Sequence, residues 1–220
     1  MSDFTVLFVN TFAAYIGVIP FLIILQIFFW KYKLPKRHQF GLYIYALAIC
    51  TILMASDTPS LYQIDYYPVF NLIPFYGFTD SFEHYIQSFL IFVPFGLLLP
   101  TLWKQFQPAK ETISYGLLFS FFIEISQVYC LATTATTDIT DLIMNTLGTL
   151  AGYFIFLQVK DMHFMGRMCL DTNDSSLKNL ARWEVYIYFF TPWLITFVLS
   201  PFISNAIWDF LWDTVIGIPM

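Results

Sequence analysis

The chain has 220 residues, of which 58% are hydrophobic and 21% aromatic, whereas only 11% are charged. Soluble domains carry about 25% charged residues, so this composition excludes an ordinary soluble protein and predicts an all-α protein that crosses a membrane several times. The formal net charge is −5 and no basic patch stands out, so we expect no nucleic-acid partner. The three cysteines form no CxxC pair, and their odd number predicts neither a disulfide framework nor a thiolate metal site.

Six apolar stretches have about the 20 residues that a helix needs to cross a bilayer. We expect a transmembrane helix in each of Phe4–Trp30, Phe40–Ser56, Tyr85–Trp103, Ser114–Leu131, Asp141–Val159 and Val185–Ile203. Several contain proline, which membrane helices tolerate, so we interpret the prolines as kinks. The first stretch has no preceding basic residue, so we expect it to remain as a helix and not to be removed as a signal peptide.

The basic residues predict how these helices are oriented. All ten Lys and Arg lie on alternate connections: four from Lys31 to Arg37, two at Lys104 and Lys110, and four from Lys160 to Arg182. The positive-inside rule then places both termini outside. We expect three parts: a first helix with a basic inner loop (1–38), a core of four helices (39–159), and an inner loop, last helix and aromatic outer tail (160–220).

Two outer segments are unusually aromatic. The connection Asp57 to His84 is too apolar for a solvated loop, so it lies on the lipid headgroups or folds back into the helix bundle. The tail Asn205 to Met220 has Trp and Phe beside two acids, which fits a short interfacial helix or a loose end.

The fourth predicted helix carries the most informative polar residue. Ser120, Glu124 and Gln127 are spaced i, i+4 and i+7 and share one face. A charge at membrane depth is disfavoured by about 2.5 to 3.5 kcal/mol, so such residues usually face a protein interior and mark a site. We therefore expect the function to involve Glu124.

The fifth predicted helix opens on Asp141, three residues after Asp138, and carries Asn145, which Glu124 and Gln127 would face in an antiparallel pair. Asp138 and Asp141 belong to this site or serve as helix caps. Asn145 either contacts a ligand or joins helices, and Gly148 with Gly152 offers a smooth strip for close packing.

The outer end of the third predicted helix adds Glu83, His84 and Gln87. His84 is either simply solvated or important as the one potentially cationic side chain that we expect in the outer half. Glu124 must then be protonated, held by hydrogen bonds, paired with His84, or neutralised by something that binds. An amine, a hydroxyl-rich or amide-rich ligand, or a cation suits such a site better than a phosphate.

Catalytic and cofactor signals are weak. No HExxH, P-loop or GxSxG motif is present, so we assign no catalytic residue and no cofactor. Four side chains offer an oxygen-rich metal set, but their spacing is not diagnostic and we assign no metal: Glu124, Asp138, Asp141 and His84.

Four motifs in order resemble the VanZ-like family of bacterial membrane proteins over about residues 68–158: NLIPF at 71–75, FVPFG at 92–96, SFFIEISQ at 120–127 and DITDLIMNTLG at 138–148. The resemblance implies a multi-pass protein of the bacterial cytoplasmic membrane, linked to glycopeptide (teicoplanin) resistance through no known reaction. It points to seven positions: Asn71, Pro74, Glu124, Gln127, Asp138, Asp141 and Asn145.

The chain departs from this family pattern in two places. Ser88 stands where members often have Asn, and Thr133 to Thr137 stand where many have a basic residue that would pair with the carboxylates. The missing basic residue implies either a changed ligand or a loss of some activity.

We favour a non-catalytic protein whose pocket of Glu124, Gln127 and Asn145, roofed by the aromatic connection, engages a lipophilic ligand in the outer leaflet. Beside membrane lipids, a lipoglycopeptide or a lipid-linked envelope precursor fits that description. One alternative is an intramembrane enzyme acting on a lipid or envelope precursor, with Glu124 as general acid or base and His84 or a metal assisting. Another is a transporter or flippase with Glu124 as proton carrier.

Overall fold

The computed structural model describes residues 3–56, 70–76, 82–127, 137–169, 184–194, 202–203, 205–207 and 209–210. The main helices are α1 (Asp3–Tyr32), α2 (Lys36–Ala55), α3 (Phe82–Leu102), α4 (Ala109–Gln127) and α5 (Ile139–Val159). Smaller elements are the 3₁₀ turn η1 (Lys104–Phe106), α6 (His163–Gly166), and the two-residue strands β1 (Phe70–Asn71) and β2 (Thr137–Asp138). Residues 184–194 are also helical. The predicted all-α class is confirmed.

The helix boundaries differ most from expectation at α4, which begins at Ala109 and not at Ser114. Pro108 precedes the helix and its carbonyl accepts from the backbone N–H groups of Glu111 and Thr112. Proline favours a helix start, and Glu111 suits the positive end of the helix dipole. The apolar pattern missed this first turn because Lys110 and Glu111 are polar.

Three of the helices that the structure describes are long and apolar enough to cross a membrane, namely α2, α3 and α5. α1 and α3 continue through their prolines without a break. The predicted count of six spans and the outward position of both termini remain predictions.

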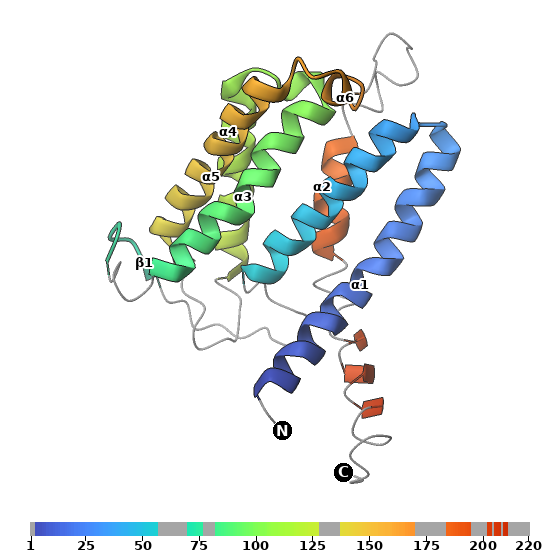
Figure 1. Ribbon diagram of the computed structural model, residues 1–220. Coiled ribbons are helices and arrows are strands. Elements are labelled where there is room, and N and C mark those ends of the chain that lie inside the picture. The colour runs from blue at the N-terminus through green and yellow to red at the C-terminus, as the bar shows by residue number, and fades with distance from the viewer. Residues whose placement is uncertain are drawn as a thin grey trace.

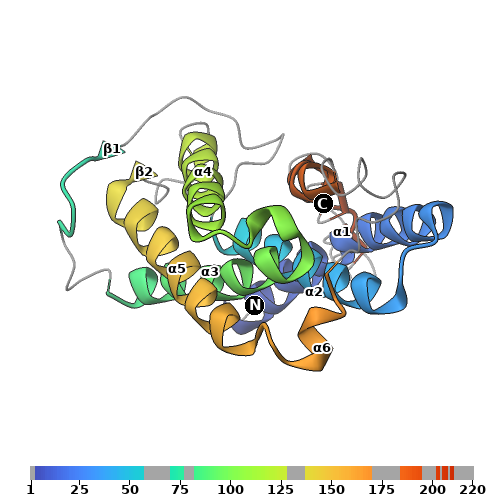
Figure 2. The same ribbon diagram turned by 90° about the horizontal axis from the view of Figure 1, so that it is seen from above.

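The long helices lie side by side, with α3 between α2 and α5 and with α1 beyond α2 (Figure 1; Figure 2). The α1–α2 turn, the α3–α4 connection and α6 lie at one end of the bundle, whereas β1 lies at the other (Figure 1). The Lys and Arg residues of the described segments all belong to the first end, which we call the basic end.

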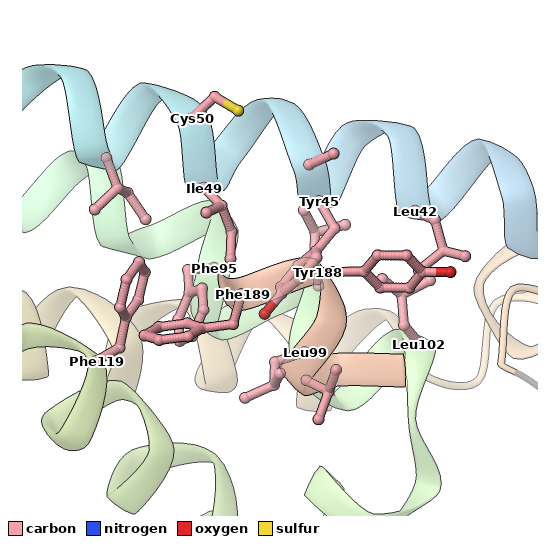
Figure 3. Packing of buried hydrophobic residues seen from close by; sticks show 14 of the residues in the cluster. Leu42, Tyr45, Ile49, Cys50, Phe95, Leu99, Leu102, Phe119, Tyr188 and Phe189 are labelled. Carbon is pink, nitrogen blue, oxygen red and sulfur yellow. The ribbon is translucent and has the colours of Figure 1, made fainter. Parts of the chain in front are cut away.

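The core joins α1, α2, α3, α4 and the stretch 184–194, and α1 contributes Phe21, Leu25 and Phe29. Tyr45 and Ile49 of α2, Phe95 of α3, Phe119 of α4 and Phe189 of the stretch 184–194 point toward one another (Figure 3). Their rings pack at centroid distances such as 5.2 Å for Phe95 with Phe119 and 4.6 Å for Phe119 with Phe189. The stretch 184–194 is therefore packed into the bundle.

Glycines allow α3 and α5 to approach closely. A Cβ atom added at Gly148 would lie 2.1 Å from the carbonyl oxygen of Phe89, and one at Gly152 would lie 2.1 Å from that of Val93. Gly96 of α3 faces α5 in the same way. The predicted packing strip is confirmed, and its partner is α3.

A fully buried carboxylate, which sequence reasoning missed, ties the stretch 184–194 to the basic end of the bundle. Glu184 accepts hydrogen bonds from Trp103 Nε1 at 2.9 Å and from the Tyr188 hydroxyl at 2.8 Å. Both of its oxygens lie 3.3 Å from His38 Nε2, while His38 Nδ1 lies 2.8 Å from the carbonyl oxygen of Met168. We call Glu184, His38, Trp103 and Tyr188 the inner hub.

Candidate functional site

The candidate site is built around the first turn of α5, where Asp138 is the N-cap. Its Oδ1 accepts from the backbone N–H of Thr140 at 2.7 Å, so the predicted capping role is confirmed. Its Oδ2 accepts from Asn71 Nδ2 at 3.0 Å and from the Tyr85 hydroxyl at 2.9 Å. Asp138 therefore joins α5, α3 and the outer connection.

The described part of the outer connection folds back onto the bundle, which is one of the two predicted alternatives. β1 and β2 are a parallel pair, with Asn71 opposite Asp138, and they lie beside the N-terminus of α5 (Figure 2). The Phe75 backbone N–H donates to Thr140 Oγ1 at 3.0 Å. Phe75 has φ 61° and follows Pro74 in a turn closed by the Tyr76 backbone N–H, a geometry that fits a type II turn.

Glu124 is buried at the contact of α4 with α5, and 4% of it is exposed. Its Oε2 accepts from the backbone N–H of Asp138 at 3.0 Å. In a capping box this N–H is bonded by the side chain three residues further along the same helix, here Asp141. Here Glu124 of the neighbouring helix α4 accepts the Asp138 N–H instead of Asp141. The Asp141 carboxylate is therefore available for other contacts. Among the described residues, none donates to Glu124 Oε1.

Asp141 binds two side chains of α3. Its Oδ1 accepts from Ser88 Oγ at 2.9 Å, and its Oδ2 lies 3.0 Å from His84 Nε2. The His84 side chain is 50% exposed and that of Asp141 is 9% exposed, so the pair stands at the surface of the site. His84 thus pairs with Asp141 and not with Glu124, and it is more than a solvated boundary residue.

One amide joins helices, which is one of the two predicted alternatives for Asn145, whereas Gln127 differs from the expected arrangement. Asn145 Nδ2 donates to Ser120 Oγ at 2.8 Å, and Gln127 Nε2 donates to the carbonyl oxygen of Ser56 at 2.6 Å. Gln127 therefore reaches the end of α2 and does not pair with Asn145. Within the described segments, Asn145 Oδ1 and Gln127 Oε1 are buried without a hydrogen-bond partner.

Comparison with known proteins identifies the family of this chain. The VanZ/LLP1 family model matches residues 40–160, which include all the side chains of the α4–α5 site. The chain belongs to the VanZ/LLP1 family. It is 33% identical over 125 residues to Protein VanZ of Enterococcus faecium, and this alignment covers 56% of the present chain and 74% of the relative. No solved structure matches the chain.

Family membership and the three apolar helices together show that this VanZ/LLP1 protein is a membrane protein. Two predicted candidates are not brought into its site: Glu83 and Gln87 have exposed side chains on α3, and within the described segments neither forms a hydrogen bond with the carboxylates. The part of the chain that the structure describes contains no cluster of three His, Cys, Asp or Glu side chains suited to a metal ion. The linker 133–136, most of the aromatic connection and most of the tail lie outside the described residues.

Sequence reasoning missed two partners in this VanZ/LLP1 site. The Tyr85 hydroxyl bonds Asp138, and the Thr140 hydroxyl receives the Phe75 backbone N–H. A buried tyrosine hydroxyl needs a hydrogen-bond partner. The position of Tyr85 at the start of an apolar helix was therefore a signal that could have identified it. Thr140 offered no comparable signal, because its partner lies in a distant connection.

Proposed function

We propose that this VanZ/LLP1 protein contributes to resistance against glycopeptide antibiotics of the teicoplanin type. It does so by binding a lipophilic ligand or a lipid-linked envelope precursor at the outer leaflet of the bacterial cytoplasmic membrane. The binding site is the contact of α4 with α5 around Glu124. Family membership supports the link to resistance, and the geometry of Glu124 supports the location of the site.

The observation that carries the proposal is a buried carboxylate with unused acceptor capacity. Glu124 is 4% exposed and uses Oε2 on Asp138, while Oε1 takes no donor from the described residues. A glutamine would accept the same Asp138 N–H with less desolvation cost, so hydrogen bonding alone does not explain an acid here. A ligand that supplies donors explains it.

The contacts favour binding over hydrolysis. Ser88 and His84 both contact Asp141, but a Ser-His-Asp triad requires the serine to bond the histidine. Here the Ser88 hydroxyl donates directly to the Asp141 carboxylate, which is a weaker base than the imidazole that activates a triad serine. The arrangement therefore suits holding a donor group in place.

The test replaces Glu124 by glutamine, which keeps an acceptor for Asp138 and removes the charge. The matched control is Glu83→Gln, because Glu83 is an exposed acid on the neighbouring helix. Both variants and the native chain are expressed at equal membrane level in a teicoplanin-sensitive host, and the inhibitory concentration of teicoplanin is measured. We expect Glu124→Gln to lose protection and Glu83→Gln to keep it. Equal protection by both variants would end the proposal.

A further inference from the structure

We infer that the ligand presents a protonated amine to the face formed by Glu124, Asp141 and Asn145. This inference rests on the proposed function, because it concerns the chemistry of the same site. It is carried by two independent observations, namely the balance of charge around the site and the surplus of buried acceptor atoms.

With its carboxylates ionised, the site carries a negative formal charge. The side chains of Glu124, Asp138 and Asp141 are all buried. The nearby group that can carry positive charge is His84, and it is paired with Asp141. The Lys and Arg residues of the described segments lie at the basic end, away from β1 and the α5 N-terminus (Figure 1). A cationic ligand compensates this charge, whereas a phosphate would be repelled.

The surplus of acceptors is separate from the charge. Asn145 is 3% exposed, and its Oδ1 has no donor in the described part of the chain. Leaving a buried acceptor unsatisfied is unfavourable, so each such atom favours a ligand that donates hydrogen bonds. A primary ammonium has three donors and no acceptor, whereas a hydroxyl has one donor.

Glu124 and Asn145 both lie at the contact of α4 with α5. The hydrogen bond from Asn145 to Ser120 fixes the Asn145 amide against α4. Ser120 is four residues before Glu124, and Asn145 is four residues after Asp141, so both carboxylates lie about one turn from this amide. The half-exposed His84 marks the side of the site that is open to water. Asp141, which is paired with His84, is the carboxylate on this side of the site.

The amine has two possible sources: the headgroup of an aminophospholipid, or an amine on another lipophilic or lipid-linked molecule. The experiment uses full-length protein in phosphatidylcholine nanodiscs and measures binding of n-octylamine, n-octanol and octyltrimethylammonium by calorimetry. These probes share one chain length and differ in charge and N–H donors. We expect saturable binding of n-octylamine alone, because the site needs both charge and N–H donors.

We expect Glu124→Gln to weaken n-octylamine binding by about tenfold to a hundredfold, the effect of losing a charge-assisted hydrogen bond. Glu83→Gln should bind like the native chain. Equal binding of n-octanol and n-octylamine, or unchanged binding by Glu124→Gln, would overturn the inference. Repeating the titration in phosphatidylethanolamine nanodiscs separates the sources: weaker n-octylamine binding identifies a lipid headgroup as competitor, and unchanged binding identifies another amine.

The two proposals fail in different ways. If Glu124→Gln loses teicoplanin protection but the native protein does not bind n-octylamine, the amine is wrong and the functional site stands. If n-octylamine binds as expected but Glu124→Gln keeps protection, the amine site stands and its link to resistance is wrong.

Discussion

The inner hub predicts that one buried side chain has a large effect on stability. Replacing Glu184 by alanine leaves two buried donor groups without their acceptor, namely Trp103 Nε1 and the Tyr188 hydroxyl, and removes the carboxylate beside His38 Nε2. Removing one partner of a buried, hydrogen-bonded pair costs about 3–5 kcal/mol of unfolding free energy. Trp103→Phe removes one donor and leaves the Glu184 carboxylate with its other partners, so it should cost about 1.5–3 kcal/mol.

The free energy of unfolding is measured by denaturant titration of the purified protein in detergent, followed by circular dichroism. We expect the order native, Trp103→Phe, Glu184→Ala from most to least stable. If the unfolding free energy of Glu184→Ala lies within about 1 kcal/mol of the native value, the inner hub does not stabilise the protein as proposed. Buried donors that lose their acceptor should cost more than that. Lys160→Ala, an exposed change at the same end of the bundle, is the control and should have little effect.

Two further pairs of variants test the helix contacts through the free energy of unfolding. Gly152→Ala should destabilise the protein by about 1–3 kcal/mol or more because its Cβ would meet the Val93 carbonyl oxygen at 2.1 Å, whereas at Gly166 the nearest atom is 3.9 Å away and alanine should be tolerated. Asp138→Ala removes a helix cap and two side-chain bonds and should cost about 2–4 kcal/mol, against about 1 kcal/mol for Asn71→Ala, which removes one of those bonds. An equal loss of unfolding free energy by both variants of a pair would contradict these contacts.

The sequence predicted which residues face inward better than it predicted their partners. Helical spacing placed Ser120, Glu124 and Gln127 on one face, and the structure agrees that Glu124 is buried. Spacing does not say which neighbouring helix meets that face. Gln127 bonds the Ser56 carbonyl oxygen at the end of α2 and not Asn145.

Long-range pairs were the least predictable. His84 and Asp141 are 57 positions apart, and His38 and Glu184 are 146 positions apart. Glu184 stands directly before an apolar stretch and close to Arg182, where a solvated position is equally consistent with the sequence. Only the packing of α2, α3 and the stretch 184–194 shows that this carboxylate is buried.

The central claim is an acidic site that faces the outside of the membrane, and chemical labelling in intact cells tests it most directly. In a chain whose cysteines are replaced by serine, His84→Cys places a thiol beside Asp141, and Lys160→Cys places one at the basic end; both positions are exposed. A membrane-impermeant maleimide should label the first in intact cells and the second only after the cells are opened. Labelling in the reverse pattern would place the site on the cytoplasmic side and contradict the account.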